Sequence, residues 1–346
     1  MVRFLQSLGK PILWLLLTTS YFLILLTSKV YKFIQRVFSI RIRIPKLSLP
    51  KIIFPRLGRK FLILIFLLFI FYLLSFIFYD AIIKDLPSPE KLITREQILT
   101  TKIYDRNNNL LYKIYLNQNR TLVKIQNIPK SLILATLAIE DAEFYQHNGL
   151  SFRGIIRAIE SNLTKGKIQG GSTITQQLVK NSLLTPEKTL KRKIKEVILA
   201  LAVEKRFSKE EILQMYLNEV GFGGAAYGVE EASLLYFGKP AANLNLAESA
   251  FLAGLPASPT TFSPFGSNPN KARERQQLVL KRMLDEKYLT KEEYENARAD
   301  EVILKPQRID IKAPHFVMYI KDLLVKEYGE NMVEQGGLEV ITSLDL

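Results

Sequence analysis

Residues 140–149 read EDAEFYQHNG, and residues 170–181 read GGSTITQQLVKN. The first stretch places a carboxyl group, Glu140, on the apolar side of a predicted helix. The second stretch is a glycine hinge that leads into another helix, whose start attracts anions and whose later turns present amides and a lysine. A buried carboxylate beside such a helix start can support the transfer of a sugar away from a phosphate leaving group.

Glu140 belongs to a set of residues that recur three or four positions apart, and the set consists of Ile133, Leu137, Glu140 and Phe144. This spacing predicts a helix over about 131–144 with the four side chains on one face. A carboxyl group on an apolar face loses hydration, which favours its protonated form and raises its pKa. Glu140 is therefore a candidate general base for a sugar hydroxyl.

Two structural interpretations apply to the same stretch. One makes Glu140 a core residue that is satisfied by a backbone amide or by an arginine such as Arg153 or Arg157, and the spacing alone does not exclude it. The other concerns His147, which we interpret as a packing and hydrogen-bonding residue of the turn after the helix rather than as a catalyst.

The second stretch contains a capping box. Thr173 and Gln176 have the spacing at which an N-cap side chain and the third helical residue each bond the other's backbone, so a helix is predicted from about residue 174. The glycine pair before it lets the chain bend. Lys180 lies two turns into this helix, within reach of an anion at its start. The alternative is a flexible loop followed by an ordinary surface helix.

A third group of charged residues follows Thr185-Pro186-Glu187, and its members are Lys188, Arg192, Lys193 and Glu196. The apolar residues of the same predicted helix lie on another stripe, so one interpretation is an exposed face of paired ions. The other interpretation makes this face the wall of a cleft that contacts a pyrophosphate and its cation. The spacing favours neither.

The N-terminal part of the chain contains two uncharged segments. Residues 61–79 span about 29 Å as a helix, roughly the thickness of a hydrocarbon core. Residues 11–28 are also uncharged, but they include a proline, three threonines and two serines, which makes them the weaker candidate. A basic stretch follows this segment and no small-x-small cleavage site does, which argues against a signal peptide. The sequence therefore predicts a membrane anchor over residues 1–80.

Most of the formal net charge of +15 comes from this N-terminal part. Residues 1–60 contain 12 Lys and Arg and no acidic residue, and ten of the twelve lie in the loop 29–60. By the positive-inside rule this loop is predicted to be cytoplasmic, which places the chain after residue 80 outside the cytoplasmic membrane. The excess charge is assigned to an anionic membrane surface and not to nucleic acid. A solvated basic loop that only sets the topology is favoured over a loop that binds specific lipids.

The chain contains no cysteine and only two histidines, His147 and His315. This composition excludes disulfides, thiolate nucleophiles and Cys/His zinc sites. A bound metal is therefore expected to be a hard divalent cation such as Mg²⁺, held by oxygen atoms and phosphate. No organic cofactor is predicted. An outward-facing chain without cysteine fits a bacterial envelope.

The rest of the chain divides into three predicted segments. Residues 81–130 form a stalk with a β-hairpin around Asn107–Asn109. Residues 131–300 form a compact, mainly α domain, because helix start signals recur along them. Besides Thr173 and Gln176, the capping pairs are Ser208 and Glu211, Asn245 and Glu248, and Thr290 and Glu293. Residues 301–346 contain a helix from Pro314 and a final strand without an evident partner, which suggests a domain border.

The chain resembles the peptidoglycan glycosyltransferases of glycosyltransferase family 51, the module of class A penicillin-binding proteins and monofunctional transglycosylases. The resemblance covers residues 85–300. The motifs that support it are Glu140-Asp141 with Phe144, His147 and Gly149; Gly171 to Asn181; Arg192-Lys193 with Glu196; Ile212-Leu213 with Tyr216-Leu217-Asn218; Tyr227-Gly228; and Tyr236-Phe237-Gly238-Lys239. It implies a lysozyme-like, mainly α domain behind N-terminal transmembrane helices, flanked by short β segments.

The resemblance also implies a reaction. Lipid II would be polymerised into glycan strands with inversion and release of polyprenyl diphosphate, with Glu140 as catalytic base and Glu196 as second acidic residue, near which a divalent cation is expected. The implied substrate-binding residues are Ser172, Thr173, Gln176, Gln177, Lys180, Asn181, Lys188, Arg192 and Lys193. Many relatives have arginine at position 188, so the lysine of this chain is expected to hold the donor pyrophosphate less firmly.

The implied partners are lipid II, the growing glycan strand, the cytoplasmic membrane, and a transpeptidase or proteins of cell division or elongation. The paired Ser-x-x-Lys and Lys-Thr-Gly motifs of a transpeptidase are not both present, so residues 301–346 are interpreted as a linker toward an absent transpeptidase domain. Two other functions stay open, a lytic transglycosylase that cleaves glycan and a non-catalytic envelope scaffold. The lysines near the second stretch argue against the first, and intact Glu140 and Glu196 argue against the second.

Overall fold

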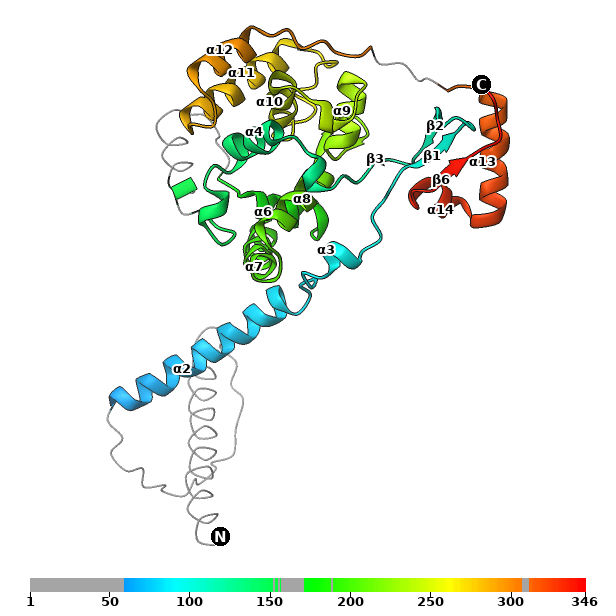
Figure 1. Ribbon diagram of the computed structural model, residues 1–346. Helices are drawn as coiled ribbons and strands as arrows, with labels where there is room; N and C mark the ends of the chain where they lie inside the picture. The colour runs from blue at the N-terminus through cyan, green and yellow to red at the C-terminus, as the bar shows by residue number, and fades with distance from the viewer. Residues whose placement is uncertain (1–58, 152, 155, 157–170, 188, 307–310) are drawn as a thin grey trace. The chain divides into compact units, whose positions relative to one another are not determined.

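The computed structural model describes residues 59–151, 153–154, 156, 171–187, 189–306 and 311–346 (Figure 1). Contacts divide the chain into two units, Met1–Phe69 and Ile70–Leu346. The predicted segment 11–28 lies outside the described residues, as does nearly all of the basic loop 29–60.

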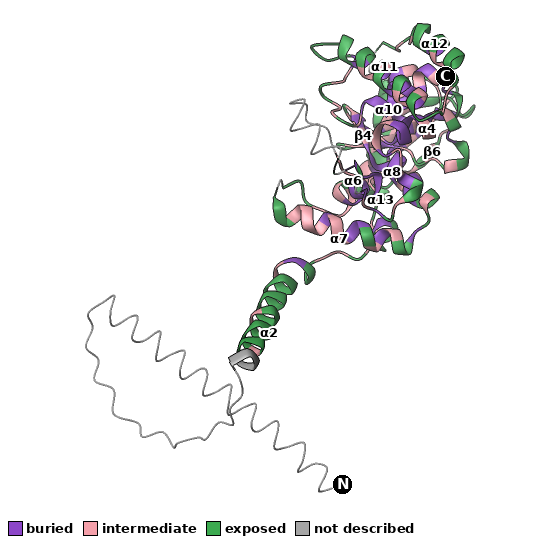
Figure 2. Ribbon diagram, turned by 90° about the vertical axis from the view of Figure 1, so that its left-hand side faces the viewer, coloured by how far each residue is buried: buried purple, intermediate pink, exposed green. Residues whose placement is uncertain are grey.

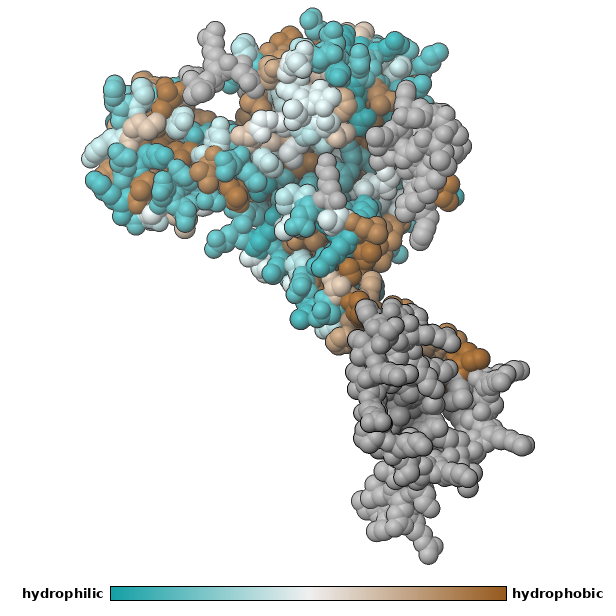
Figure 3. Space-filling view, turned by 180° about the vertical axis from the view of Figure 1, so that it is seen from behind, coloured by the Kyte–Doolittle hydropathy of each residue, from teal (hydrophilic) through white to brown (hydrophobic). Residues whose placement is uncertain are grey.

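The apolar helix α2 (Arg59–Phe78) continues into one π-helical turn, η1 (Tyr79–Ile83). A helix satisfies every backbone hydrogen bond within one segment, which a chain in hydrocarbon requires. Among the described residues, Ile63–Ile83 is the one helical stretch long and apolar enough to cross a membrane. Most of its apolar side chains are exposed, and Figure 3 shows the visible part of α2 as hydrophobic surface. The position agrees with the span predicted at residues 61–79.

Most of the unit after α2 is helical, which confirms the predicted mainly α fold class. Between α2 and residue 300 the helices with defined bounds are α3 (Lys91–Thr94), η2 (Ile125–Asn127), α4 (Lys130–Glu140), η3 (Phe144–Gln146), α6 (Ile174–Ser182), α7 (Leu190–Arg206), α8 (Lys209–Glu219), α9 (Val229–Phe237), η4 (Ala241–Asn243), α10 (Leu246–Gly254), α11 (Asn270–Asp285) and α12 (Lys291–Ala299), besides the turn η1 described above. All four predicted capping boxes are present, and they begin α6, α8, α10 and α12.

The main hydrophobic core lies where α4 packs on α10 and α11 and where α6 packs on α8. Figure 2 shows the buried residues gathered along α4, α6, α8 and α10. The largest fully buried side chains of this core include Tyr216, Tyr236, Phe144 and Phe222. Burying each of the core's leucine or isoleucine side chains contributes about 1.5–3 kcal/mol, so this packing fixes the helices that the candidate site is built on.

A second, smaller cluster surrounds a three-stranded sheet with the order β2-β1-β6. Strand β1 (Thr101–Tyr104) and strand β2 (Leu110–Ile114) form the predicted hairpin. In its turn Asn108 has a φ of 61°, and the Asp105 carboxylate accepts hydrogen bonds from the backbone of Asn107 and Asn109. Short polar side chains tolerate this left-handed conformation, which is why an asparagine run forms the turn.

The C-terminal segment is folded against this hairpin. Strand β6 (Glu339–Ile341) pairs in parallel with β1, and helices α13 (Pro314–Tyr328) and α14 (Glu330–Gln335) contribute Val317 and Val333 to the same cluster. The last strand, which has no partner nearby in the sequence, therefore pairs with a distant strand, and residues 311–346 contain packed elements. The partner lies more than 200 positions earlier in the chain, so local sequence pattern does not reveal it. A second small sheet, with the order β3-β5-β4, consists of β3 (Asn119–Arg120), β4 (Gly221–Gly223) and β5 (Ala226–Tyr227).

Candidate active site

Glu140 is the last residue of α4 and is half-buried. One of its carboxylate oxygens, Oε2, accepts a hydrogen bond of 2.6 Å from Gln177 Nε2 on α6. The other oxygen, Oε1, is buried and has no hydrogen-bond partner among the described residues. Burial raises the pKa of Glu140 above its usual 4.5, against the lowering effect of the Gln177 hydrogen bond. The site therefore contains a carboxylate of raised basicity with one lone pair unused.

The predicted helix over 131–144 ends four residues early, because Asp141 leaves the helical conformation with φ −161° and ψ 75°. Its buried carboxylate accepts a hydrogen bond of 3.1 Å from the Ile174 backbone N–H in the first turn of α6. It also lies 2.9 Å from His147 Nε2. A carboxylate at a helix start satisfies an orphan donor and interacts favourably with the helix dipole. Asp141 thus fixes the start of α6 beside the end of α4.

His147 and Gly149 complete this junction. The Gly149 N–H donates to His147 Nδ1 at 3.2 Å, so Nε2 carries the proton that His147 donates to Asp141. The Gly149 carbonyl accepts a 2.7 Å hydrogen bond from Thr173 Oγ1, and the φ of Gly149, +89°, is one that favours glycine. His147 therefore has the hydrogen-bonding role that the sequence predicts for it.

Thr173 and Gln176 form the capping box of α6. The Gln176 N–H donates to Thr173 Oγ1 at 3.2 Å, and Gln176 Oε1 accepts from the Thr173 N–H at 2.9 Å. Both side chains are buried. These two predicted substrate-binding residues therefore hold the backbone at the start of α6.

Gln177 connects the site to the core. Its Nε2 donates to Glu140, and its Oε1 accepts a long hydrogen bond of 3.4 Å from the buried Tyr216 hydroxyl on α8. Burial and the nearby Glu140 charge raise the pKa of Tyr216 well above 10.0, so this hydroxyl stays a donor at neutral pH. The amide is thereby oriented with its nitrogen toward the carboxylate.

Glu196 lies in α7 and is 2% exposed, which contradicts the interpretation of this residue as part of an exposed ion-paired face. Its Oε1 pairs with the Lys193 ammonium, which also donates to Ser172 Oγ at 2.9 Å. The Lys193 side chain is 45% exposed, so its charge reaches solvent while the carboxylate does not. The second acidic residue is thus neutralised by a lysine that the loop before α6 helps to hold.

Two further cations lie near this pair. Arg192 on α7 has a buried Nε without a hydrogen-bond partner among the described residues. Lys180 on α6 makes no hydrogen bond or ion pair with them and is half-buried, and burial lowers its pKa more than the neighbouring Glu196 raises it. Lys180 and Arg192 therefore lie near the Glu196–Lys193 ion pair. Cations that are not already paired with a carboxylate can bind an anionic group.

The structure brings most of the predicted residues together on α4, α6 and α7. Asn181 is exposed at the end of α6, and Lys188 lies outside the described residues. Arg153 bonds Glu143 at 3.1 Å and not Glu140, and Arg157 lies outside the described residues, so the described structure gives Glu140 no such arginine partner.

A cation site made by protein groups alone does not fit the described residues. They contain no group of three or more His, Cys, Asp or Glu side chains that could hold a metal. Glu196 supplies one carboxylate, and the Lys193 ammonium already occupies its Oε1. The expected divalent cation stays a prediction that depends on oxygen atoms from a phosphate.

Arg275 on α11 is a charged residue of this region that the sequence patterns do not single out. Of the positive charges that lower the pKa of Glu140, its contribution is the largest, followed by that of Lys180. Arg275 lies four positions before the buried Val279 on α11, so it borders the apolar stripe of this helix. An arginine beside an apolar stripe was the sequence signal that could have indicated a partly buried charge.

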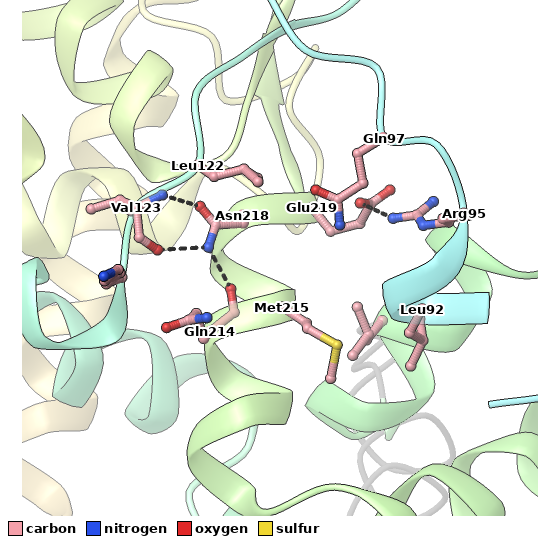
Figure 4. A pocket seen from close by; sticks show the side chains of 11 residues that line it. Leu92, Arg95, Gln97, Leu122, Val123, Gln214, Met215, Asn218 and Glu219 are labelled. Atoms are coloured by element: carbon pink, nitrogen blue, oxygen red, sulfur yellow. Dashed lines mark hydrogen bonds and ion pairs between the residues drawn. The ribbon is translucent and has the colours of Figure 1, made fainter. Parts of the chain in front are cut away.

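A cavity of about 340 Å³ lies elsewhere, between the segment around α3 and the C-terminal half of α8 (Figure 4). None of the predicted site residues lines it. Among the residues that line it, Arg95 pairs with Glu219. The Asn218 side chain accepts a hydrogen bond from the Val123 N–H and donates one to the Val123 carbonyl. These contacts attach the chain after the membrane helix to α8, and we assign them a structural role.

Comparisons with known proteins identify the family of the chain. The family model described as Transglycosylase matches residues 107–284. Penicillin-binding protein 1A of Aquifex aeolicus is 41% identical over 271 residues, which are 78% of this chain and 37% of the relative. Penicillin-binding protein 1A of Escherichia coli is 39% identical over 261 residues, 75% of this chain and 30% of the relative.

A crystal structure of penicillin-binding protein 1A from Haemophilus influenzae is 26% identical, covers 72% of this chain and 27% of its own, and has a TM-score of 0.41. The chain spans about a third of the length of the curated relatives that it matches.

Proposed function

Since this chain belongs to the transglycosylase family, we propose that it is a peptidoglycan glycosyltransferase that polymerises lipid II into glycan strands. The observation that supports this most is the Glu140 carboxylate. One oxygen is held by Gln177 and the other has no hydrogen-bond partner among the described residues. A base needs a lone pair that no protein donor already uses, and Glu140 has one.

In the proposed reaction Glu140 removes the proton from the 4-hydroxyl of the acceptor sugar. The acceptor oxygen then forms a bond to the anomeric carbon of the donor, and the bond from that carbon to the pyrophosphate oxygen breaks. Attack from the face opposite the leaving group inverts the anomeric carbon. The raised pKa of Glu140 suits it to hold this proton through the transfer.

The leaving polyprenyl diphosphate gains negative charge as its bond breaks. Lys180, Arg192 and Lys193 lie near Glu196, and we assign to them the task of offsetting this negative charge on the diphosphate. Lys180 has no ion-pair partner among the described residues, so its charge is available to a ligand. Charges fixed before the reaction stabilise the transition state without a cost of reorganisation.

We place the catalytic domain outside the cytoplasmic membrane, with α2 as its anchor. The basic loop 29–60 and the apolar stretch Ile63–Ile83 support this orientation. A single cysteine at the exposed Ser267 tests it, because the chain has no other cysteine. It should react with an impermeant maleimide in intact cells, and reaction only after permeabilisation would reverse the orientation.

Purified full-length protein incubated with lipid II tests the activity. With lipid II that carries a labelled sugar, the expected product is a labelled polymer, which Glu140→Gln should not make. A second incubation contains a preformed glycan strand, and release of short fragments from that strand would identify a lytic transglycosylase instead. Binding of lipid II without either product would identify a non-catalytic scaffold.

A further inference from the structure

Arg95 lies in the segment between the membrane helix and β1, outside the three charged stretches described above. It directly follows α3, whose buried Leu92 packs into the main hydrophobic core and so fixes the course of this segment. The Arg95 side chain is 24% exposed. Its guanidinium reaches the C-terminal ends of α6 and α8, two helices that pack against each other.

Two nitrogens of this guanidinium bond one helix end each. Nη1 donates a hydrogen bond of 3.2 Å to the carbonyl of Ser182, the last residue of α6. Nη2 pairs with Oε2 of Glu219, the last residue of α8 (Figure 4). The last carbonyls of a helix have no intrahelical donor and form the negative end of its dipole. A guanidinium presents several donors in a rigid fork, so it can join both helix ends at once.

We propose that Arg95 is a positioning residue for the transfer reaction, which holds the C-terminal end of α6 so that the side chains of this helix stay in place beside Glu140. This inference rests on the proposed function, because α6 positions the reaction only if Glu140 is the base. Gln177 on α6 donates the 2.6 Å hydrogen bond to Glu140, and Lys180 follows it by about one turn. Arg95 touches neither side chain and acts through the helix that carries them.

Side chains of opposite charge hold the two ends of α6. The Asp141 carboxylate accepts a hydrogen bond from the Ile174 N–H in the first turn, and Arg95 donates to the last residue. Each charge interacts favourably with the end of the helix dipole that it faces. The helix has only nine residues, so a shift at its C-terminal end moves Gln177 as well. A misplacement of about 1 Å near the reacting groups can lower a rate by up to about a hundredfold.

A second arginine allows Arg95 to be replaced without leaving a buried charge unpaired. Arg120 is almost fully buried, and its Nη2 lies 3.4 Å from Oε1 of Glu219. Glu219 therefore keeps a cationic neighbour when Arg95 is changed, and the large cost of breaking a buried ion pair is avoided. We therefore expect Arg95→Gln to give a folded protein.

The first test measures kcat/KM for lipid II polymerisation by the full-length protein. Arg95→Gln should lower it about tenfold, and Arg95→Lys, which keeps the charge but not the fork, about threefold. Lys91→Gln removes an equal charge from an exposed position of α3 and should stay within about twofold of wild type. In a Gln177→Ala background Arg95→Gln should cost about threefold or less, because part of its effect passes through Gln177. An equal factor in both backgrounds would mean that the two residues act independently, which overturns the proposal.

The second test needs no substrate and measures hydrogen exchange of the backbone amides in the same proteins. In Arg95→Gln the amides of α6 should exchange at least about threefold faster than in wild type, while those of α10, which lies away from Arg95, keep their rates. Unchanged exchange in α6, or equally faster exchange in α10, would make Arg95 an ordinary stabilising residue and overturn the proposal. If wild-type protein makes no polymer, the proposed function fails and the role of Arg95 in the transfer fails with it. The exchange rates still decide whether Arg95 holds α6.

Discussion

The half-buried Glu140 and the buried Glu196 are two glutamates of one candidate site, and their surroundings are opposite. Glu196 lies against the Lys193 ammonium and is almost fully buried. Glu140 bonds a neutral amide through one oxygen and has no described partner for the other. An ion pair stabilises the ionised carboxylate, whereas burial without a cation in contact favours the protonated form. We therefore propose that the same residue type accepts a proton in one place and anchors a cation in the other.

The largest effect is expected from Glu140→Gln, which keeps the size of the side chain and its contact with Gln177 but removes the basic lone pair. General base catalysis contributes about 10²–10⁴-fold, so polymerisation should fall by that factor while lipid II still binds. Initial rates and lipid II binding of the purified variant check this. A rate above about a tenth of wild type would exclude Glu140 as the base.

Glu196→Gln should have a smaller effect. The amide oxygen can still accept from Lys193, but an ion pair becomes a hydrogen bond between the ammonium and a neutral acceptor. This change costs about 1–1.5 kcal/mol, or about tenfold in rate if Lys193 then orients the donor poorly. The rate should fall mainly through weaker donor binding. Polymerisation measured over a range of lipid II concentrations separates KM from kcat. If Glu196→Gln lowered kcat as much as Glu140→Gln and left KM unchanged, the two glutamates would not differ in role.

Gln177→Ala sharpens the comparison further. The Gln177 hydrogen bond lowers the pKa of Glu140, so its loss raises that pKa and moves the acidic limb of the rate profile upward. On the limb the rate should fall about threefold, with recovery at higher pH. Asn181→Ala, at the exposed end of the same helix, is the matched control and should keep the wild-type limb. An unchanged limb in Gln177→Ala would mean that this amide does not tune the base.

The smallest effect is on stability. The folded-state pKa of Glu140 is raised, so the folded protein binds this proton more tightly than the unfolded chain. The free energy of unfolding should therefore fall as pH rises from about the ordinary value of 4.5 through the folded-state pKa. Glu140→Gln removes this fall and should be more stable than wild type at neutral pH. Denaturant melts at several pH values measure it, and a variant less stable at neutral pH would contradict the sign.

Much of the helical part could be predicted because its signals are local. The capping boxes at Thr173, Ser208, Asn245 and Thr290 each involve residues three positions apart, and each begins a helix in the structure. The apolar stretch near residues 61–79 is likewise a property of one segment. Local hydrogen bonds and continuous apolar runs need no knowledge of the rest of the chain.

The features that sequence patterns missed depend on distant contacts. Helix α4 stops at Glu140 because Asp141 turns to bond Ile174, a residue 33 positions away. Strand β6 finds β1 across most of the chain. Glu196 is off the apolar stripe of its helix, yet it is buried. Arg275 reaches the region of Glu140 through the packing of α11 on α4. Periodicity states which face of an element is apolar, but not which charged residue on its border a neighbouring element will cover.

The pH dependence of a single turnover in the two glutamate variants tests the division of labour most directly. We predict that Glu196→Gln keeps the acidic limb of the wild-type profile at a lower overall rate. In Glu140→Gln the residual rate should be independent of pH over the same range, because the group that titrates is gone. A limb that persists in Glu140→Gln and vanishes in Glu196→Gln would show that Glu196 takes the proton, and the assignment of the base would be wrong.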